Sequence, residues 1–187
     1  MPAPTDPARR EAHALALLHA FGAADLDHPG GTLLAHLRRV QEQLAAWGAR
    51  PALQLAGLCH AFYGTDGFAT TLLPVGRRAE LAAVIGAEAE EITYVYASCD
   101  RGASYPSLDA EAPAFHDRFT GQVHSPDRQC RRDFAELSCA NELDLARIDP
   151  AFRTAWGPDL LALFTRSRGL LSEPAWRDCR AVLDGVG

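Results

Sequence analysis

The sequence contains no lysine, so all 18 of its basic residues are arginine. This absence excludes a Schiff-base lysine, a Ser–Lys catalytic dyad and a phosphate-binding loop of the GxxxxGK[ST] type. The five cysteines form no CxxC pair, and their number is odd. We therefore expect neither a disulfide framework nor a cysteine-rich zinc site, but reduced and mostly packed thiols.

Long apolar runs and clustered positive charge are missing as well. Histidine, arginine or glutamate interrupts every apolar stretch well short of the roughly 18 residues that a membrane span needs. The N-terminal segment lacks the pattern of a signal peptide, and the net charge is −6 with no basic stripe. We expect a cytoplasmic protein that binds neither membranes nor nucleic acid, with a small molecule as its partner.

Helical periodicity runs through almost the whole chain. Its 187 residues, 48% of them hydrophobic, are enough for one sizeable core, and the pattern predicts a single all-α domain over 1–187. The segment 102–125 has no clear period and is expected to be a functional flap or a mobile loop. Helices are expected over 7–22, 33–47, 51–63, 77–85, 87–99, 126–147, 158–168 and 174–184.

Two histidines occupy unusual places in this pattern. His36 lies at the edge of the apolar face of the second predicted helix, and His60 lies inside the most apolar helix of the chain. Buried imidazoles need partners for their ring nitrogens. Asp100 extends the apolar face of the helix 87–99, where an uncompensated carboxylate is costly. Two imidazoles and one carboxylate on neighbouring helices form a facial triad that suits a divalent ion.

The run HLRRVQEQLAAWGARPALQLAGLCHAF resembles the metal-binding core of the HD (His–Asp) superfamily. His36 matches the first histidine of that superfamily and His60 the histidine of its His-Asp pair. The stretch RRAELAAVIGAEAEEITYVYASCD is similar to the segment that precedes the final aspartate in the alarmone-hydrolase branch, which puts Asp100 in the place of the last ligand. The resemblance implies an HD-like helical core at about 28–101, with the helices of 126–187 added after it.

Ala61 stands where the superfamily has the aspartate of its His-Asp pair. Because that aspartate bridges the ions of two-metal members, the resemblance implies one divalent ion here, of manganese, iron or zinc. Its predicted ligands are His36, His60 and Asp100, with His28 or solvent as a further ligand.

Five other residues complete the predicted site. Asp66, or a histidine of the segment 102–125, is expected to handle a proton, and Arg101 to act beside it on the reacting anion. Arg77 and Arg78 are expected to hold a phosphate or carboxylate, and Tyr63 to contact the substrate.

The resemblance predicts a divergent metal-dependent enzyme that hydrolyses a phosphate ester or nucleotide at a mononuclear site. Two alternatives stay open on the sequence. One is a mononuclear non-haem iron oxygenase, since two histidines and a carboxylate also suit iron and oxygen. The other is a degenerate HD-like domain that binds a ligand or protein partner without turnover, which the loss of the aspartate at Ala61 favours. The oligomeric state is left open.

Overall fold

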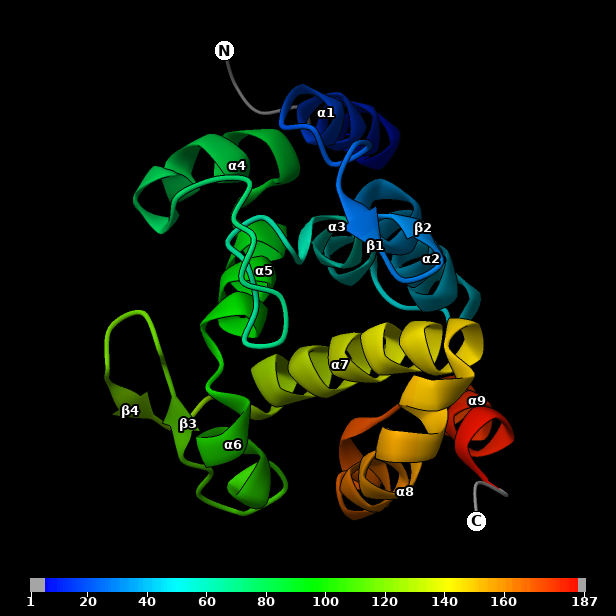
Figure 1. Ribbon diagram of the computed structural model, residues 1–187. Helices are drawn as coiled ribbons and strands as arrows, with labels where there is room; N and C mark the ends of the chain where they lie inside the picture. The colour runs from blue at the N-terminus through cyan, green and yellow to red at the C-terminus, as the bar shows by residue number, and fades with distance from the viewer. Residues whose placement is uncertain (1–5, 185–187) are drawn as a thin grey trace. The chain divides into compact units, whose positions relative to one another are not determined.

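The computed structural model describes residues 6–184, and within them nearly all regular structure is helical (Figure 1). The all-α class is therefore confirmed. The strands of the described part form two hairpins whose strands are two residues long. In the described residues we find no helix with the length and apolar character needed to cross a membrane.

The chain divides into two compact units, residues 1–97 and 98–187. We describe each by itself, and the expectation of a single domain stays a prediction. The N-terminal unit contains, in chain order, α1 (Pro7–Ala20), β1 (Asp27–His28), β2 (Gly31–Thr32), α2 (Leu33–Ala46), α3 (Pro51–Cys59), η1 (Val75–Arg77), α4 (Arg78–Ile85) and α5 (Ala87–Ser98, whose last residue falls in the second unit).

Helices α2 and α3 form the centre of the N-terminal unit, and α1 packs against α3 and α4. The start of α2 is fixed by Thr32, whose hydroxyl accepts a hydrogen bond from the backbone N–H of Ala35 at 3.2 Å. Gly57 lets the two central helices approach closely, because a Cβ atom there would lie 2.5 Å from Cδ1 of the buried Leu44. This close packing holds the two histidine-bearing helices together.

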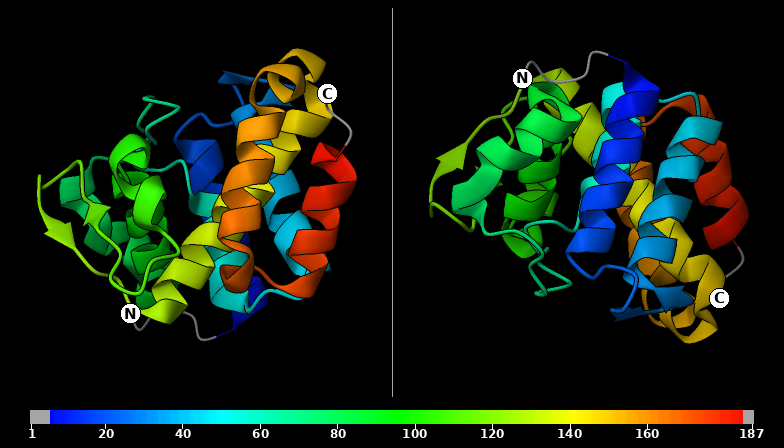
Figure 2. Two further views of the ribbon diagram at one scale, coloured as in Figure 1. Left: turned by 90° about the horizontal axis from the view of Figure 1, so that it is seen from below. Right: turned by 90° about the horizontal axis from the view of Figure 1, so that it is seen from above.

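The C-terminal unit is built around the long helix α7, against which α8 and α9 pack (Figure 2). Its elements are α6 (Arg101–Ser104), η2 (Tyr105–Ser107), β3 (Phe115–His116), β4 (Val123–His124), α7 (Arg128–Ile148), α8 (Pro150–Arg166), η3 (Arg168–Leu170) and α9 (Glu173–Leu183).

Two expectations about the C-terminal unit need correction. The segment 102–125 is not one irregular loop, since it contains α6, η2 and the hairpin of β3 and β4. Helix α8 begins at Pro150 rather than at residue 158, because Asp149 caps it by accepting hydrogen bonds from the backbone N–H groups of Ala151 and Phe152. Pro158, which looked like a helix start, lies inside the helix.

Candidate functional site

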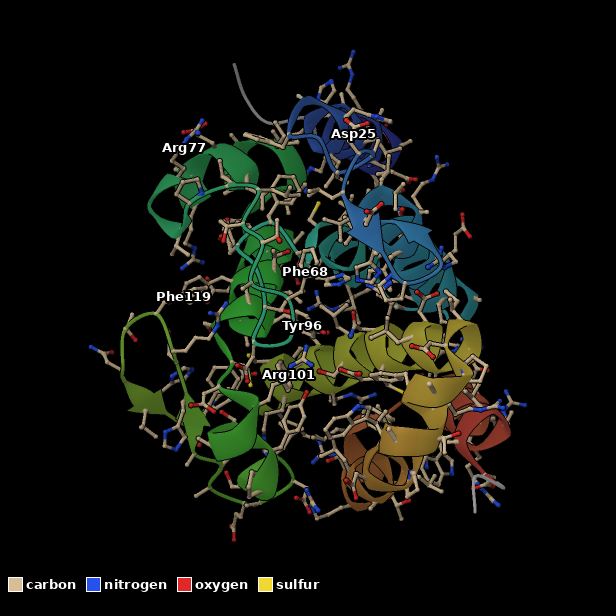
Figure 3. All side chains as sticks on the ribbon, in the orientation of Figure 1. Asp25, Phe68, Arg77, Tyr96, Arg101 and Phe119 are labelled. Carbon is tan, nitrogen blue, oxygen red and sulfur yellow. The ribbon has the colours of Figure 1, made fainter. Side chains whose placement is uncertain are left out.

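Three imidazoles and two aromatic rings form a cluster in the N-terminal unit. The ring of His36 on α2 lies 4.1 Å from that of His28 and 5.3 Å from that of His60, measured between centroids. Tyr96 on α5 contacts His60 at 5.2 Å, and Phe68 contacts His28 at 5.6 Å (Figure 3). His36 and His60 are 1% and 2% exposed. The structure therefore brings together three of the four predicted metal ligands.

The hairpin of β1 and β2 brings His28 to the cluster. Gly30 in the turn and Gly31 at the start of β2 have φ angles of +79° and +131°, a backbone region that favours glycine. The second strand leads directly into the Thr32 cap of α2, so His28 and His36 are carried by consecutive elements. The HPGGT sequence therefore positions His28 beside the start of α2.

The tautomer of His60 follows from its hydrogen bond. Its Nδ1 lies 2.7 Å from the carbonyl oxygen of Gly57, one turn earlier in the same segment. A carbonyl oxygen can only accept, so Nδ1 carries the hydrogen and donates it. In the neutral ring the lone pair then lies on Nε2, and an imidazole held in this way is ready to bind a metal ion.

Ring orientation decides which histidines can share an ion. The planes of His36 and His60 meet at 81°, whereas those of His28 and His36 are stacked at 22°. Ring-nitrogen lone pairs lie in the ring planes, so crossed rings can direct them to one point and stacked rings cannot. In the described residues no group of three or more histidine, cysteine, aspartate or glutamate side chains has a geometry that could hold a metal ion. The two imidazoles whose ring planes cross, those of His36 and His60, are therefore the pair that could bind one ion together.

Asp100 and Arg101 belong to the C-terminal unit. The expectation that Asp100 extends the helix 87–99 is wrong, because α5 ends at Ser98. Asp100 is the N-cap of α6, and its carboxylate accepts a hydrogen bond from the backbone N–H of Ala103 at 3.0 Å. Arg101 donates to the buried carboxylate of Glu142 on α7 at 2.9 Å, and the amide of Asn141 donates to the same oxygen at 3.3 Å.

The predicted anion-binding arginines are both held by carboxylates. Arg77 forms a two-point ion pair with Glu80, with both distances 2.6 Å. Arg78 donates two hydrogen bonds to Glu90, at 2.7 and 2.8 Å, and one to Glu91 at 2.6 Å. Its guanidinium also stacks over the ring of Tyr94 on α5. These contacts stabilise the junction of α4 and α5.

Tyr63 donates its hydroxyl hydrogen to Glu90 at 2.7 Å. Burial, followed by the hydrogen bond to Glu90, raises the pKa of the Tyr63 hydroxyl. It therefore stays protonated and serves as a donor. Asp66 is exposed at the tip of a tight turn in which Thr65 and Phe68 exchange backbone hydrogen bonds at 2.7 and 3.2 Å.

Sequence reasoning did not place Phe68 or Glu90 in this region. Tyr96 had a detectable signal, because it lies on the apolar face of its helix four residues after Ile92. Glu90 and Phe68 had none: the first lies in an acidic run that looks like a solvated surface, and the second lies in a turn whose direction no periodicity defines.

Comparison with known proteins adds one finding. Residues 17–101 match a family described as a domain of unknown function (DUF6817). The matched segment contains the predicted metal ligands and the predicted substrate-binding residues, from His28 to Arg101, but not the histidines of the segment 102–125. No curated protein and no solved structure matches the chain. The HD resemblance and its hydrolytic chemistry therefore stay predictions.

Proposed function

We propose that this protein binds one divalent metal ion through Nε2 of His36 and Nε2 of His60, and that it is a hydrolase of a phosphate ester or nucleotide. The observation that carries the proposal is the hydrogen bond from Nδ1 of His60 to the carbonyl of Gly57 beside the crossed ring of His36. This hydrogen bond leaves the lone pair of the buried His60 ring on Nε2, in a fixed orientation. The proposal rests on this pair of imidazoles, and the ligand roles of His28 and Asp100 stay predictions from the sequence.

Each side chain of the proposed site has a definite task. The Gly57 carbonyl holds the His60 ring in one tautomer, and the rings of Phe68 and Tyr96 pack against His28 and His60. A bound divalent ion supplies Lewis acidity toward a phosphoryl oxygen. The exposed carboxylate of Asp66 takes up a proton. Arg101 is held by Glu142 within the C-terminal unit, and its role toward the anion stays a prediction from the sequence.

Elemental analysis of the purified protein, after reconstitution with manganese, iron or zinc, tests the metal site. We expect about one ion per chain in the wild type and loss of that ion in His60→Ala, because removing one of two imidazoles removes half of the protein donors. The matched control is His13→Ala, which removes an exposed histidine of α1 and should keep the ion. A wild type without metal after reconstitution contradicts the proposal.

The reaction is tested separately with the metal-loaded protein. Release of phosphate or nitrophenol from a panel of nucleotides and nitrophenyl phosphates should depend on His60 and be lost on chelation. Bound iron with oxygen consumption and no hydrolysis supports the oxygenase alternative instead.

One observation favours a second candidate, a domain that binds a ligand without turnover. Arg77 and Arg78 already carry carboxylate partners, and Ala61 lacks a carboxylate at the place where the HD superfamily has one. Binding of metal and nucleotide without hydrolysis, measured by calorimetry, supports this candidate over the hydrolase.

A further inference from the structure

Two buried thiols face each other between α7 and α9. Cys139 on α7 and Cys179 on α9 are both 0% exposed, and a hydrogen bond joins their side chains. The two helices belong to the C-terminal unit and pack against each other. Both cysteines are free thiols in the structure. A hydrogen bond between two thiols brings their sulfur atoms together, and the formation of a disulfide needs this proximity.

Two polar contacts join α7 and α9, one before and one after Cys139 along α7. Ser172 donates to Glu136, one helical turn before this thiol, at 2.5 Å. Arg147 donates to Asp178, the residue before the α9 thiol, at 2.5 Å. Together with the packing of the helices, these contacts hold α7 and α9 in register. The two cysteines therefore face each other without a covalent bond between them.

Two other cysteines provide a comparison with this pair. Cys59 on α3 is also 0% exposed, and burial alone raises the pKa of its thiol, with no part played by a second cysteine. Cys130 on α7 is only half-buried. Cys59 is therefore the matched example of a buried thiol without a thiol partner, and Cys130 is an accessible one.

The position of α9 decides when the pair can react. Burial and, after it, the hydrogen bond with Cys179 raise the pKa of the Cys139 thiol, so this thiol stays protonated and unreactive while α9 is in place. Helix α9 contributes one stripe of buried residues at a spacing of four, namely Ala175, Cys179 and Leu183. A helix held along one narrow stripe can open by local unfolding, and its opening exposes both thiols.

We propose that Cys139 and Cys179 are a redox pair, which a low-molecular-weight disulfide such as oxidised glutathione converts into a disulfide that ties α9 to α7. When α9 opens, the Cys179 thiol loses its proton to solvent, and the thiolate attacks one sulfur atom of oxidised glutathione. A mixed disulfide forms, and one glutathione thiolate leaves. The Cys139 thiol then loses its proton and attacks Sγ of Cys179, which breaks the mixed disulfide and releases the second glutathione. The two cysteines lose two electrons and two protons, and the two glutathione molecules leave as thiols.

The disulfide changes the stability of the C-terminal unit. It joins residues about 40 positions apart in the sequence, so it removes conformational freedom from the unfolded chain. It also prevents α9 from separating from α7. The reduced protein can therefore open at α9, whereas the oxidised protein keeps this helix in place.

Incubation of the full chain with oxidised glutathione tests the proposal. We expect the intact mass to fall by two hydrogen atoms, a non-reducing digest to contain a peptide that links Cys139 with Cys179, and dithiothreitol to reverse both changes. Cys59→Ala is the matched control and should form the same link, whereas Cys179→Ala should form none. A wild type that keeps both thiols reduced, or that carries only glutathione adducts on them, overturns the proposal.

Thermal unfolding measures how the disulfide acts on the fold. The oxidised wild type should melt about 5 °C or more above the reduced wild type, since the crosslink closes a long loop. Cys179→Ala should melt at the same temperature with and without the glutathione treatment. An oxidised wild type that melts no higher than the reduced one contradicts a disulfide that fits between α7 and α9 as they are packed.

The rate of oxidation tests whether α9 must open first. Ser172→Ala removes the cap of α9 and its contact with Glu136, so the crosslink should form roughly fivefold faster than in wild type. Ser125→Ala, which changes an exposed serine outside the helices, is the control and should react at the wild-type rate. Equal rates in Ser172→Ala and wild type contradict the opening of α9 as the controlling step.

Discussion

At the scale of single residues, two neighbouring arginines differ in how their carboxylate partners are buried. Glu90 has a side chain 6% exposed and accepts from both Arg78 and Tyr63, whereas the pair of Arg77 and Glu80 is exposed. Because Arg78 is itself about a third exposed, Glu90→Gln should lower the free energy of unfolding by about 2 kcal/mol rather than by the full cost of a buried pair.

Urea denaturation of Glu90→Gln beside Glu80→Gln checks this expectation. The second substitution removes the carboxylate of an exposed ion pair and should give no measurable change, since solvent screens such pairs. Equal losses in the free energy of unfolding of the two variants would contradict the stabilising role of the contacts that Glu90 makes with Arg78 and Tyr63.

The sequence predicts some of these residue environments and not others. His36 and His60 are buried as expected, because their apolar neighbours recur at helical spacing and force any residue between them into the core. The partners of Arg78 were not predictable, since several glutamates follow it in the sequence and only the folded structure brings Glu90 and Glu91 to its guanidinium. Asp100 was misplaced because a new helix begins directly after it.

At the scale of elements, α7 and the start of α9 are joined through one hydroxyl. Ser172 donates to Glu136 of α7 at 2.5 Å and accepts from the backbone N–H of Ala175 at 3.3 Å, which caps α9. Burial raises the pKa of the Glu136 carboxyl, although Ser172 and the charge of Arg132 oppose the shift. The contribution of Glu136 to the stability of the fold therefore depends on pH.

The sign of this dependence follows from proton linkage. With a raised pKa in the folded state, Glu136 keeps its proton to higher pH when folded than when unfolded, where its pKa is near the ordinary 4.5. The contribution of Glu136 to stability is complete when the pH is below the pKa of the unfolded state. It falls as the pH rises from the unfolded pKa through the raised folded pKa, and it stays low at higher pH. Glu136→Gln should therefore be more stable than wild type at pH 7, with the advantage vanishing below about pH 4.5.

Thermal unfolding of both proteins from pH 4 to pH 8 measures this difference. Glu111→Gln, which removes an exposed carboxylate, is the control for a general charge effect. A stability difference between Glu136→Gln and wild type that does not change with pH would contradict the assignment.

Most helices were predictable because each has a sequence signal at its start, such as Thr32 before α2 and the prolines that begin α1 and α3. The hairpins were not, since two-residue strands are too short to show alternation. The missed first half of α8 has a physical reason too. Gly157 and Pro158 resemble a helix boundary, but Asp149 and Pro150 form the real one.

At the scale of the whole molecule, the two compact units were not visible in the sequence. No Pro- or Gly-rich linker separates residues 97 and 98, because this boundary falls at the end of a continuous helix. The candidate site shows the same limit: a sequence pattern names ligands on separate helices, but only tertiary packing determines the ring angles that let some of them converge.

Gly57 links the packing of the N-terminal unit to the candidate site. A Cβ atom at this position would lie 2.5 Å from Cδ1 of Leu44, and the Gly57 carbonyl oxygen accepts the hydrogen bond from Nδ1 of His60. A substitution of Gly57 by alanine would therefore disturb the contact of α2 with α3 and the orientation of the His60 ring at the same time. The residue with the smallest side chain thus ties the stability of this unit to the geometry of its buried histidines.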